Sequence, residues 1–303
     1  MGFLRKRSAP NGPSPAAGGG SPRRRGGRVN APVGRGREPD WRSYDSVAET
    51  YARIQAPRMS LPAKDLVELA GVGPGARVLD LGTGTGVAAR AAAAVAGDAG
   101  LVVGIDQSLP MLLAAAREGG GPRYAAAEAI DLPFRTGAFD AVLASFVLAL
   151  FTKYDTALFD MLRVLRPGGV IGVAVWGPSE DEFQRAWRDV AWEFAEREIL
   201  TDAMKRATPW EERFSDPSRL KDTLHEAGVR DMVVDRREYR FQMSREDYLT
   251  GREMAATGRF LRQMLGEDLW ERLRARARQV FAERFPERFN DFREVILVVG
   301  RKP

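Results

Sequence analysis

The residues best suited to chemistry lie at positions 78–86, where an acid precedes three alternating glycines. The stretch reads Val-Leu-Asp-Leu-Gly-Thr-Gly-Thr-Gly, so Asp80 stands two residues before Gly82. Glycine lets the backbone turn tightly and lets a ligand approach it closely. A helix that follows such a loop points its free N–H groups at that ligand. The pattern predicts a ligand site that includes Asp80, Gly82, Thr83, Gly84 and Gly86.

A second acid, Asp106, follows 20 residues after Gly86, at the end of the next expected strand. A carboxylate at this place can accept hydrogen bonds from both hydroxyls of a ribose. The alternative is a purely structural glycine turn beside a solvated Asp106. The strand–loop–helix context, with the acid at this distance, favours a nucleotide site.

Two details indicate which nucleotide fits. The spacing is Gly-x-Gly-x-Gly, whereas the loop that seats a pyrophosphate has Gly-x-Gly-x-x-Gly. Asp80 beside the loop is unfavourable for a phosphate but suits a cation. S-adenosylmethionine, with its ammonium, sulfonium and adenosine, meets these requirements. A nicotinamide-dependent reductase and a non-catalytic nucleotide-binding protein are the alternatives from another class.

Apolar runs of strand length alternate with helical patterns, which is typical of βαβ units and a parallel sheet. The sequence predicts an α/β fold, Rossmann-like and doubly wound, with a mostly parallel seven-stranded sheet. The expected strands lie at 78–81, 101–105, 124–127, 139–144, 170–175, 232–234 and 296–299, and the expected helices at 87–96, 111–117 and 154–165. A further helix should begin at Pro217 after an Asp216 cap and end before Gly228.

Two long charged blocks, 178–216 and 244–291, have helical patterns and are expected to be cap insertions on the domain 40–303. In the first block Phe183, Trp187, Val190 and Phe194 share one helical stripe, which indicates core packing. Trp192 falls on the opposite face. It is either a scattered exposed residue or part of a lining for an apolar substrate.

These motifs together resemble the class I S-adenosylmethionine-dependent methyltransferases, in particular the small-molecule and quinone branch. The resemblance rests on 78–86, 104–106, 127–134, 138–142 and 162–169, with 44–51 upstream. It implies that the glycine loop and Asp80 hold the methionine moiety and that Asp106 holds the ribose. The cofactor residues assigned beyond the loop are Gln107, Ala127, Glu128, which flanks the adenine, and Ser145, at the tip of the fourth strand.

The chain departs from that family at two places. Ala126 stands where an acid often binds the adenine amino group, and Ala149-Leu150-Phe151 stand where the quinone branch often has a His pair, which argues against quinone C-methylation. We expect methyl transfer by in-line displacement to a small apolar or aromatic molecule. Phe146, Trp176 and Trp192 are the candidate substrate-lining residues. The catalytic residue is unknown, with Tyr44 and Tyr51 as candidates for a base.

Composition excludes several other chemistries. The chain has no cysteine and one histidine, so disulfides, thiolate metal sites and multi-histidine sites are excluded, and no metal is expected. No apolar run approaches the ~18 residues of a membrane helix, and we expect a cytoplasmic protein.

The net charge of +5 comes from the first 39 residues, which hold nine basic residues and one acid among many Gly and Pro. That segment predicts a disordered arm, and the rest of the chain is mildly acidic. Nucleic acid is therefore not expected as a partner beyond weak non-specific contact through the arm. An RNA or protein methyltransferase that docks through the arm is the alternative. The oligomeric state cannot be read from the sequence.

Overall fold

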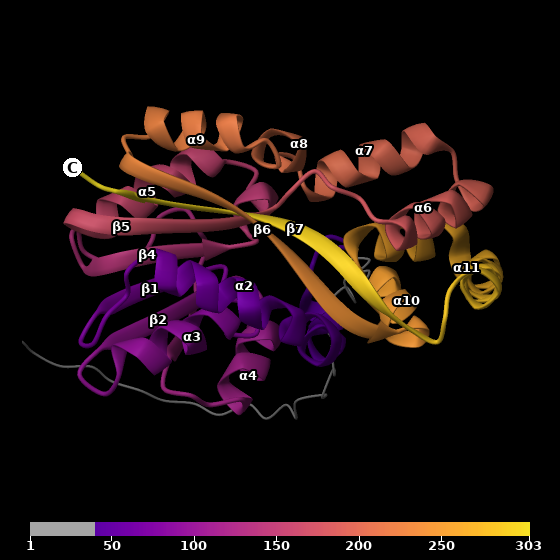
Figure 1. Ribbon diagram of the computed structural model, residues 1–303, viewed down its shortest axis with the longest axis horizontal. Coiled ribbons are helices and arrows are strands. Elements are labelled where there is room, and N and C mark those ends of the chain that lie inside the picture. The colour runs from indigo at the N-terminus through magenta and orange to yellow at the C-terminus, as the bar shows by residue number, and fades with distance from the viewer. Residues whose placement is uncertain (1–39) are drawn as a thin grey trace, which may run out of the picture. The chain divides into compact units, whose positions relative to one another are not determined.

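A seven-stranded sheet forms the centre of the structure, a computed structural model that describes residues 40–303 (Figure 1). The strand order is β3-β2-β1-β4-β5-β7-β6. The strands are β1 (Arg77–Leu81), β2 (Leu101–Asp106), β3 (Arg123–Ala126), β4 (Phe139–Ser145), β5 (Leu165–Trp176), β6 (Arg230–Ser244) and β7 (Arg288–Arg301). The first five pair in parallel, and β7 runs antiparallel to both β5 and β6.

The central strands are apolar because helices cover both faces of the sheet. Successive side chains of β1 point to opposite faces. Val78 packs in a cluster with α2 (Ala56–Leu69) and α3 (Val87–Ala96), whereas Leu79 packs with α5 (Tyr154–Val164) and α9 (Pro217–Glu226). Figure 1 shows α2 and α3 on one face and α5 and α9 on the other, with α4 (Leu109–Arg117) near β2 and β3. The expected doubly wound fold is confirmed.

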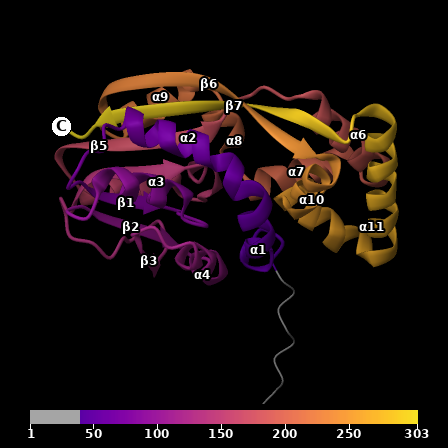
Figure 2. The same ribbon diagram turned by 60° about the horizontal axis from the view of Figure 1, so that its bottom comes forward.

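The antiparallel pair β6–β7 extends beyond the rest of the sheet. Strand β7 pairs with β5 only through Val295–Arg301, while the preceding residues 288–294 pair with β6 alone. The cap helices gather at this free end (Figures 1 and 2). They are α6 (Glu182–Phe194), α7 (Arg197–Ala207), α10 (Arg245–Met254) and α11 (Ala256–Arg284), the last kinked at Gly266, whereas α8 (Glu211–Phe214) lies beside α9.

The predicted apolar stripe of α6 packs into the core of the cap. Phe183 and Trp187 are buried, and the Phe183 ring stacks on Phe289 of β7 with centroids 3.9 Å apart. Asp181 caps α6 through a capping box with Gln184, and Ser244 accepts a hydrogen bond from the backbone of Asp247 at the start of α10. Local signals therefore set where the cap helices begin.

The last strand is longer than the sequence predicts. It begins at Arg288 rather than near 296, so the second helical block ends at Arg284 and not at 291. The strand was predicted too short because Asp291 and Glu294 are charged and were expected to be exposed to solvent. Both are buried in β7. Asp291 pairs with Arg58 and Glu294 with Arg236. Charge compensation by distant residues is not visible in the local pattern.

The N-terminal part of the described chain crosses from the cap to α2. A 3-10 turn at Asp45–Val47 leads through α1 (Ala48–Thr50) and a π-helical turn at Tyr51–Gln55 into α2. The predicted disordered arm, residues 1–39, lies outside the described residues. This crossing segment is important for the site because Tyr51 lies on it.

Candidate functional site

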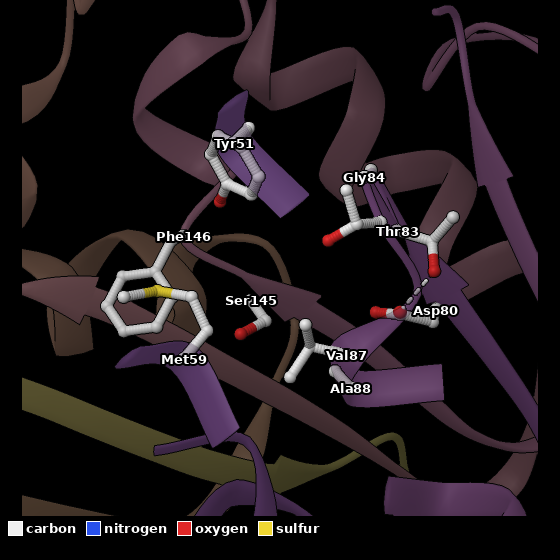
Figure 3. A pocket seen from close by; sticks show the side chains of 11 residues that line it. Tyr51, Met59, Asp80, Thr83, Gly84, Val87, Ala88, Ser145 and Phe146 are labelled. Atoms are coloured by element: carbon white, nitrogen blue, oxygen red, sulfur yellow. Dashed lines mark hydrogen bonds between the residues drawn. The ribbon is translucent and has the colours of Figure 1, made fainter. Parts of the chain in front are cut away.

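A pocket lies at the carboxyl end of β1 and β4, between the glycine loop and the crossing segment (Figure 3). It has a volume of about 350 Å³, part of which is open to solvent. Of the predicted site residues, Tyr51, Asp80, Gly82, Thr83, Gly84, Ser145 and Phe146 line it. In Figure 3 Asp80, Thr83 and Gly84 lie on one side, Phe146 and Met59 on the other, and Ser145 between them. Ligands of open α/β sheets bind at such strand ends.

Asp80 is the buried charge of this pocket. Its Oδ2 accepts a hydrogen bond from the Thr83 hydroxyl at 2.6 Å, and its Oδ1 is buried without a protein partner. Burial raises the pKa of Asp80 to about 7, although the Thr83 hydroxyl and the Ala89 backbone amide act in the opposite direction. A buried carboxylate oxygen without a partner is costly. A cationic group in the pocket would satisfy it.

Asp106 connects the end of β2 to the glycine loop. Its Oδ2 accepts from the Gly84 amide and its Oδ1 from the Ser108 amide, both at 2.8 Å. Burial raises the pKa of Asp106, while these backbone hydrogen bonds act to lower it. A carboxylate has about four acceptor positions. Asp106 is therefore held in place and keeps acceptor capacity for a hydroxyl donor.

Two glycines are required by close packing under the loop. A Cβ on Gly82, whose φ is +65°, would lie 2.3 Å from Cγ2 of Val147. A Cβ on Gly104 of β2 would lie 2.6 Å from Oγ1 of Thr83. Gly86, also at positive φ, precedes the first residue of α3. Gly104 thus makes room for the Thr83 hydroxyl that donates to Asp80. From the sequence, Gly104 could be recognised only as a glycine within a strand.

The tip of β4 forms the apolar wall. Phe146 adopts a φ of +57°, which is strained for a residue with a side chain and is typical of functional sites. Its ring lies 4.2 Å from that of Trp176 at the end of β5. Trp176 does not line the pocket directly but supports the ring that does. Arg293 lies on the same indole, 4.3 Å from the Trp176 ring centroid.

The two candidate tyrosines lie together on the crossing segment. The Tyr44 and Tyr51 rings meet edge to face at 6.0 Å. Burial raises the pKa of both hydroxyls above the usual value near 10. A tyrosine whose pKa is raised is a poorer base at neutral pH, so this environment does not favour deprotonation of either side chain.

The other predicted site residues lie outside the pocket lining. Gln107 and Glu128 are exposed after β2 and β3, and the Ala127 amide donates to the Asp106 carbonyl at 3.1 Å. Trp192 lies on α6 between the guanidinium groups of Arg188 and Arg197, at 4.7 and 4.1 Å from its ring centroid. The indole is thus occupied by surface cation–π contacts.

Sequence reasoning missed four lining residues, which are Met59, Thr85, Val87 and Ala88. Thr85 lies in the glycine loop and Val87 and Ala88 follow it directly, so the loop motif could have indicated all three. Met59 comes from α2 and nothing in its local pattern distinguishes it from a core residue. The Thr85 hydroxyl is also buried without a protein partner, which adds a second polar group at the base of the pocket.

Two further properties concern residues 40–303 only. Within this range no three His, Asp or Glu side chains are grouped in a way that could hold a metal ion. None of its helices is both long and apolar enough to cross a membrane.

Comparison with known proteins agrees with this geometry. Residues 79–173 match the family model of the methyltransferase domain. A curated relative is demethylmenaquinone methyltransferase of Parafrankia sp. (strain EAN1pec), 40% identical over 157 residues, which are 45% of this chain and 56% of that protein. The chain spans about half the length of the curated relatives it matches.

Solved structures share the fold. The [4+2]-cyclase SpnF has a TM-score of 0.54 at 21% identity, over 86% of this chain and 93% of that chain. Phosphoethanolamine N-methyltransferase 2 of Haemonchus contortus, solved in complex with S-adenosyl-L-methionine, has a TM-score of 0.52 at 18% identity, over 87% and 60%. The structure therefore has the Rossmann-like class I fold that the sequence motifs indicated, and its residues 79–173 match the methyltransferase-domain model. Because one neighbour is named a cyclase, the fold alone does not define the reaction.

Proposed function

We propose that the protein is an S-adenosylmethionine-dependent methyltransferase that acts on a small apolar or aromatic molecule. The observation that carries the proposal is the Oδ1 of Asp80, which is buried at the pocket without a partner. An ammonium group of the nucleotide would satisfy this oxygen, and Asp106 lies where the ribose hydroxyls would bind. The matched family model and the nucleotide-bound structural neighbour support this assignment.

The residues fit the cofactor in three respects. Asp80 offers an acceptor to a cation, Gly84 leaves the loop without a side chain on the pocket surface, and Asp106 is held by two backbone amides. When bound, the cofactor supplies a methyl group on a positively charged sulfur. The protein's contribution is to orient the acceptor and to exclude water, and such positioning can supply effective molarities of ~10⁵ M or more.

Phe146, Met59 and Tyr51 provide the wall against which the acceptor would lie. Met59 is buried, and Phe146 is fixed between the pocket and Trp176. A flat apolar molecule matches such a wall better than a strongly hydrated one. The name of the curated relative points to a demethylated quinone as one acceptor of this kind. The absence of the family's His pair at 149–151 favours a different acceptor.

Calorimetry tests the proposal. The protein should bind S-adenosylmethionine and S-adenosylhomocysteine, and NAD should not compete. Failure of both sulfur nucleotides to bind would overturn the proposal. Preference for NAD would instead support a nicotinamide-dependent enzyme.

A further inference from the structure

Three arginines from distant parts of the chain lie close enough for their charges to act on one another. Arg58 comes from α2, Arg252 from α10 and Arg293 from the extended end of β7. Burial lowers the pKa of Arg58 to about 10, and the charges of Arg293 and Arg252 lower it as well. Burial and the Arg252 charge likewise lower the pKa of Arg293. We call these three residues the arginine cluster.

The nearby acids only partly compensate the cluster. Arg58 pairs with the buried Asp291. The two oxygens of Asp181 accept from the backbone amides of Gln184 and Phe292. Among residues 40–303, the side chains of Arg252 and Arg293 form no ion pair or hydrogen bond with the protein.

Two more groups face the cluster. The Tyr248 hydroxyl is buried without a partner, as is Nε of Arg252 one turn further along α10. Burial raises the pKa of the Glu211 carboxyl, while the charge of Arg293 lowers it. Buried guanidinium and hydroxyl groups are normally paired because an unpaired one costs free energy. The cluster therefore has spare donors that the folded chain itself does not use.

The cluster connects to the proposed cofactor pocket through aromatic rings. The guanidinium of Arg293 lies 4.3 Å from the ring centroid of Trp176, and that ring lies 4.2 Å from Phe146, which lines the pocket. On the other side, burial raises the pKa of Tyr51, and the nearby charge of Arg58 acts in the opposite direction. An acceptor that extends from Phe146 past Trp176 would bring its far end to Arg293.

We propose that Arg252 and Arg293, with the Tyr248 hydroxyl, bind the carboxylate of an aromatic acid that serves as the methyl acceptor. This inference rests on the proposed function and names its substrate class. Guanidinium forks match the two oxygens of a carboxylate. A single negative charge suits the cluster better than a phosphate dianion, because Asp181, Asp291 and Glu211 lie close by.

Binding of 2-naphthoate and of its neutral amide, 2-naphthamide, tests the site. Both are titrated by calorimetry, with and without S-adenosylhomocysteine. The acid should bind at least roughly tenfold more tightly than the amide, as expected for hydrogen bonds to a charged group. Equal binding of the two, or no binding of the acid, would overturn the inference. Tighter binding of 2-naphthyl phosphate than of the acid would overturn the carboxylate assignment.

Variants separate the anion site from a structural role. Arg293→Met should remove the preference for the acid over the amide, whereas Arg272→Met, at an exposed arginine on α11, should leave that preference unchanged. Tyr248→Phe removes only the unpartnered hydroxyl, so it should weaken acid binding severalfold at an unchanged melting temperature. If the wild-type protein does not bind the nucleotide, the proposed function is overturned. The preference for the acid over the amide, measured without nucleotide, tests this inference by itself.

Discussion

The amide of Gly84 donates a 2.8 Å hydrogen bond to Oδ2 of Asp106, and this contact joins the loop after β1 to the end of β2. The second oxygen of Asp106 accepts a hydrogen bond from the Ser108 amide. The side-chain hydroxyl of Ser108 in turn donates to Asp45 on the crossing segment. The carboxylate is thus fixed before any ligand arrives. Preorganisation of this kind lowers the entropic cost of binding.

Replacement of Asp106 should therefore weaken nucleotide binding. Asp106→Ala removes charge-assisted hydrogen bonds worth about 1.5–3 kcal/mol each, so two of them should raise the Kd for S-adenosylhomocysteine by about a hundredfold or more. Asp98→Ala, at an exposed acid before β2, is the matched control. Titration calorimetry measures both variants, and equal affinities would contradict the role of Asp106.

Nucleotide affinity should depend on pH through Asp80. Burial raises its pKa to about 7, so below that pH the carboxyl is protonated and must lose its proton to bind an ammonium group. The affinity for S-adenosylhomocysteine should rise by roughly tenfold per pH unit up to about pH 7 and then level off.

Asp80→Asn provides the control for this pH dependence. The variant should bind weakly and lose the steep rise between pH 5 and 7. Asp106 also has a raised pKa, so a shallower slope should remain. An unchanged slope in Asp80→Asn would show that another group titrates.

Gly104→Ala should disturb both stability and binding. The new Cβ would lie 2.6 Å from the Thr83 hydroxyl, which must move away from Asp80. Overpacking of this kind costs about 1–3 kcal/mol of unfolding free energy. Gly73→Ala, where a Cβ meets nothing within 4 Å, is the control. Urea unfolding together with nucleotide titration would detect the two effects, and identical behaviour of the two variants would refute the packing argument.

The buried ion pair between Arg58 and Asp291 should be important for folding. Their side chains are 12% and 1% exposed, so Asp291→Asn leaves a buried arginine beside two others. Removal of one partner of a buried pair costs about 3–5 kcal/mol. Asp202→Asn removes an exposed pair with Arg206 and should cost roughly 0.5 kcal/mol or less. Chemical denaturation of both variants measures the difference.

The sequence by itself determined the fold class and predicted the side of the pocket that the glycine loop forms. Asp80, the glycine loop and Asp106 are close in the chain, and their roles follow from the order of strand, loop and helix. The beginning of α9 was likewise predictable, because its Asp216 cap directly precedes Pro217. The candidates Phe146 and Ser145 were found because they end a strand whose place in the sheet was evident.

Only the tertiary structure brought together the apolar wall of the pocket and the arginine cluster. Met59 and the arginine cluster come from helices and a strand that are far apart in the sequence, so no spacing brings them together. Strand β7 was underestimated because buried Asp291 and Glu294 have partners on other elements. Trp192 shows the converse, since an aromatic residue on the outer helix face proved to lie between surface arginines. Local patterns record the backbone hydrogen bonds and the apolar face of each element, whereas charge pairing between elements appears only when the chain is folded.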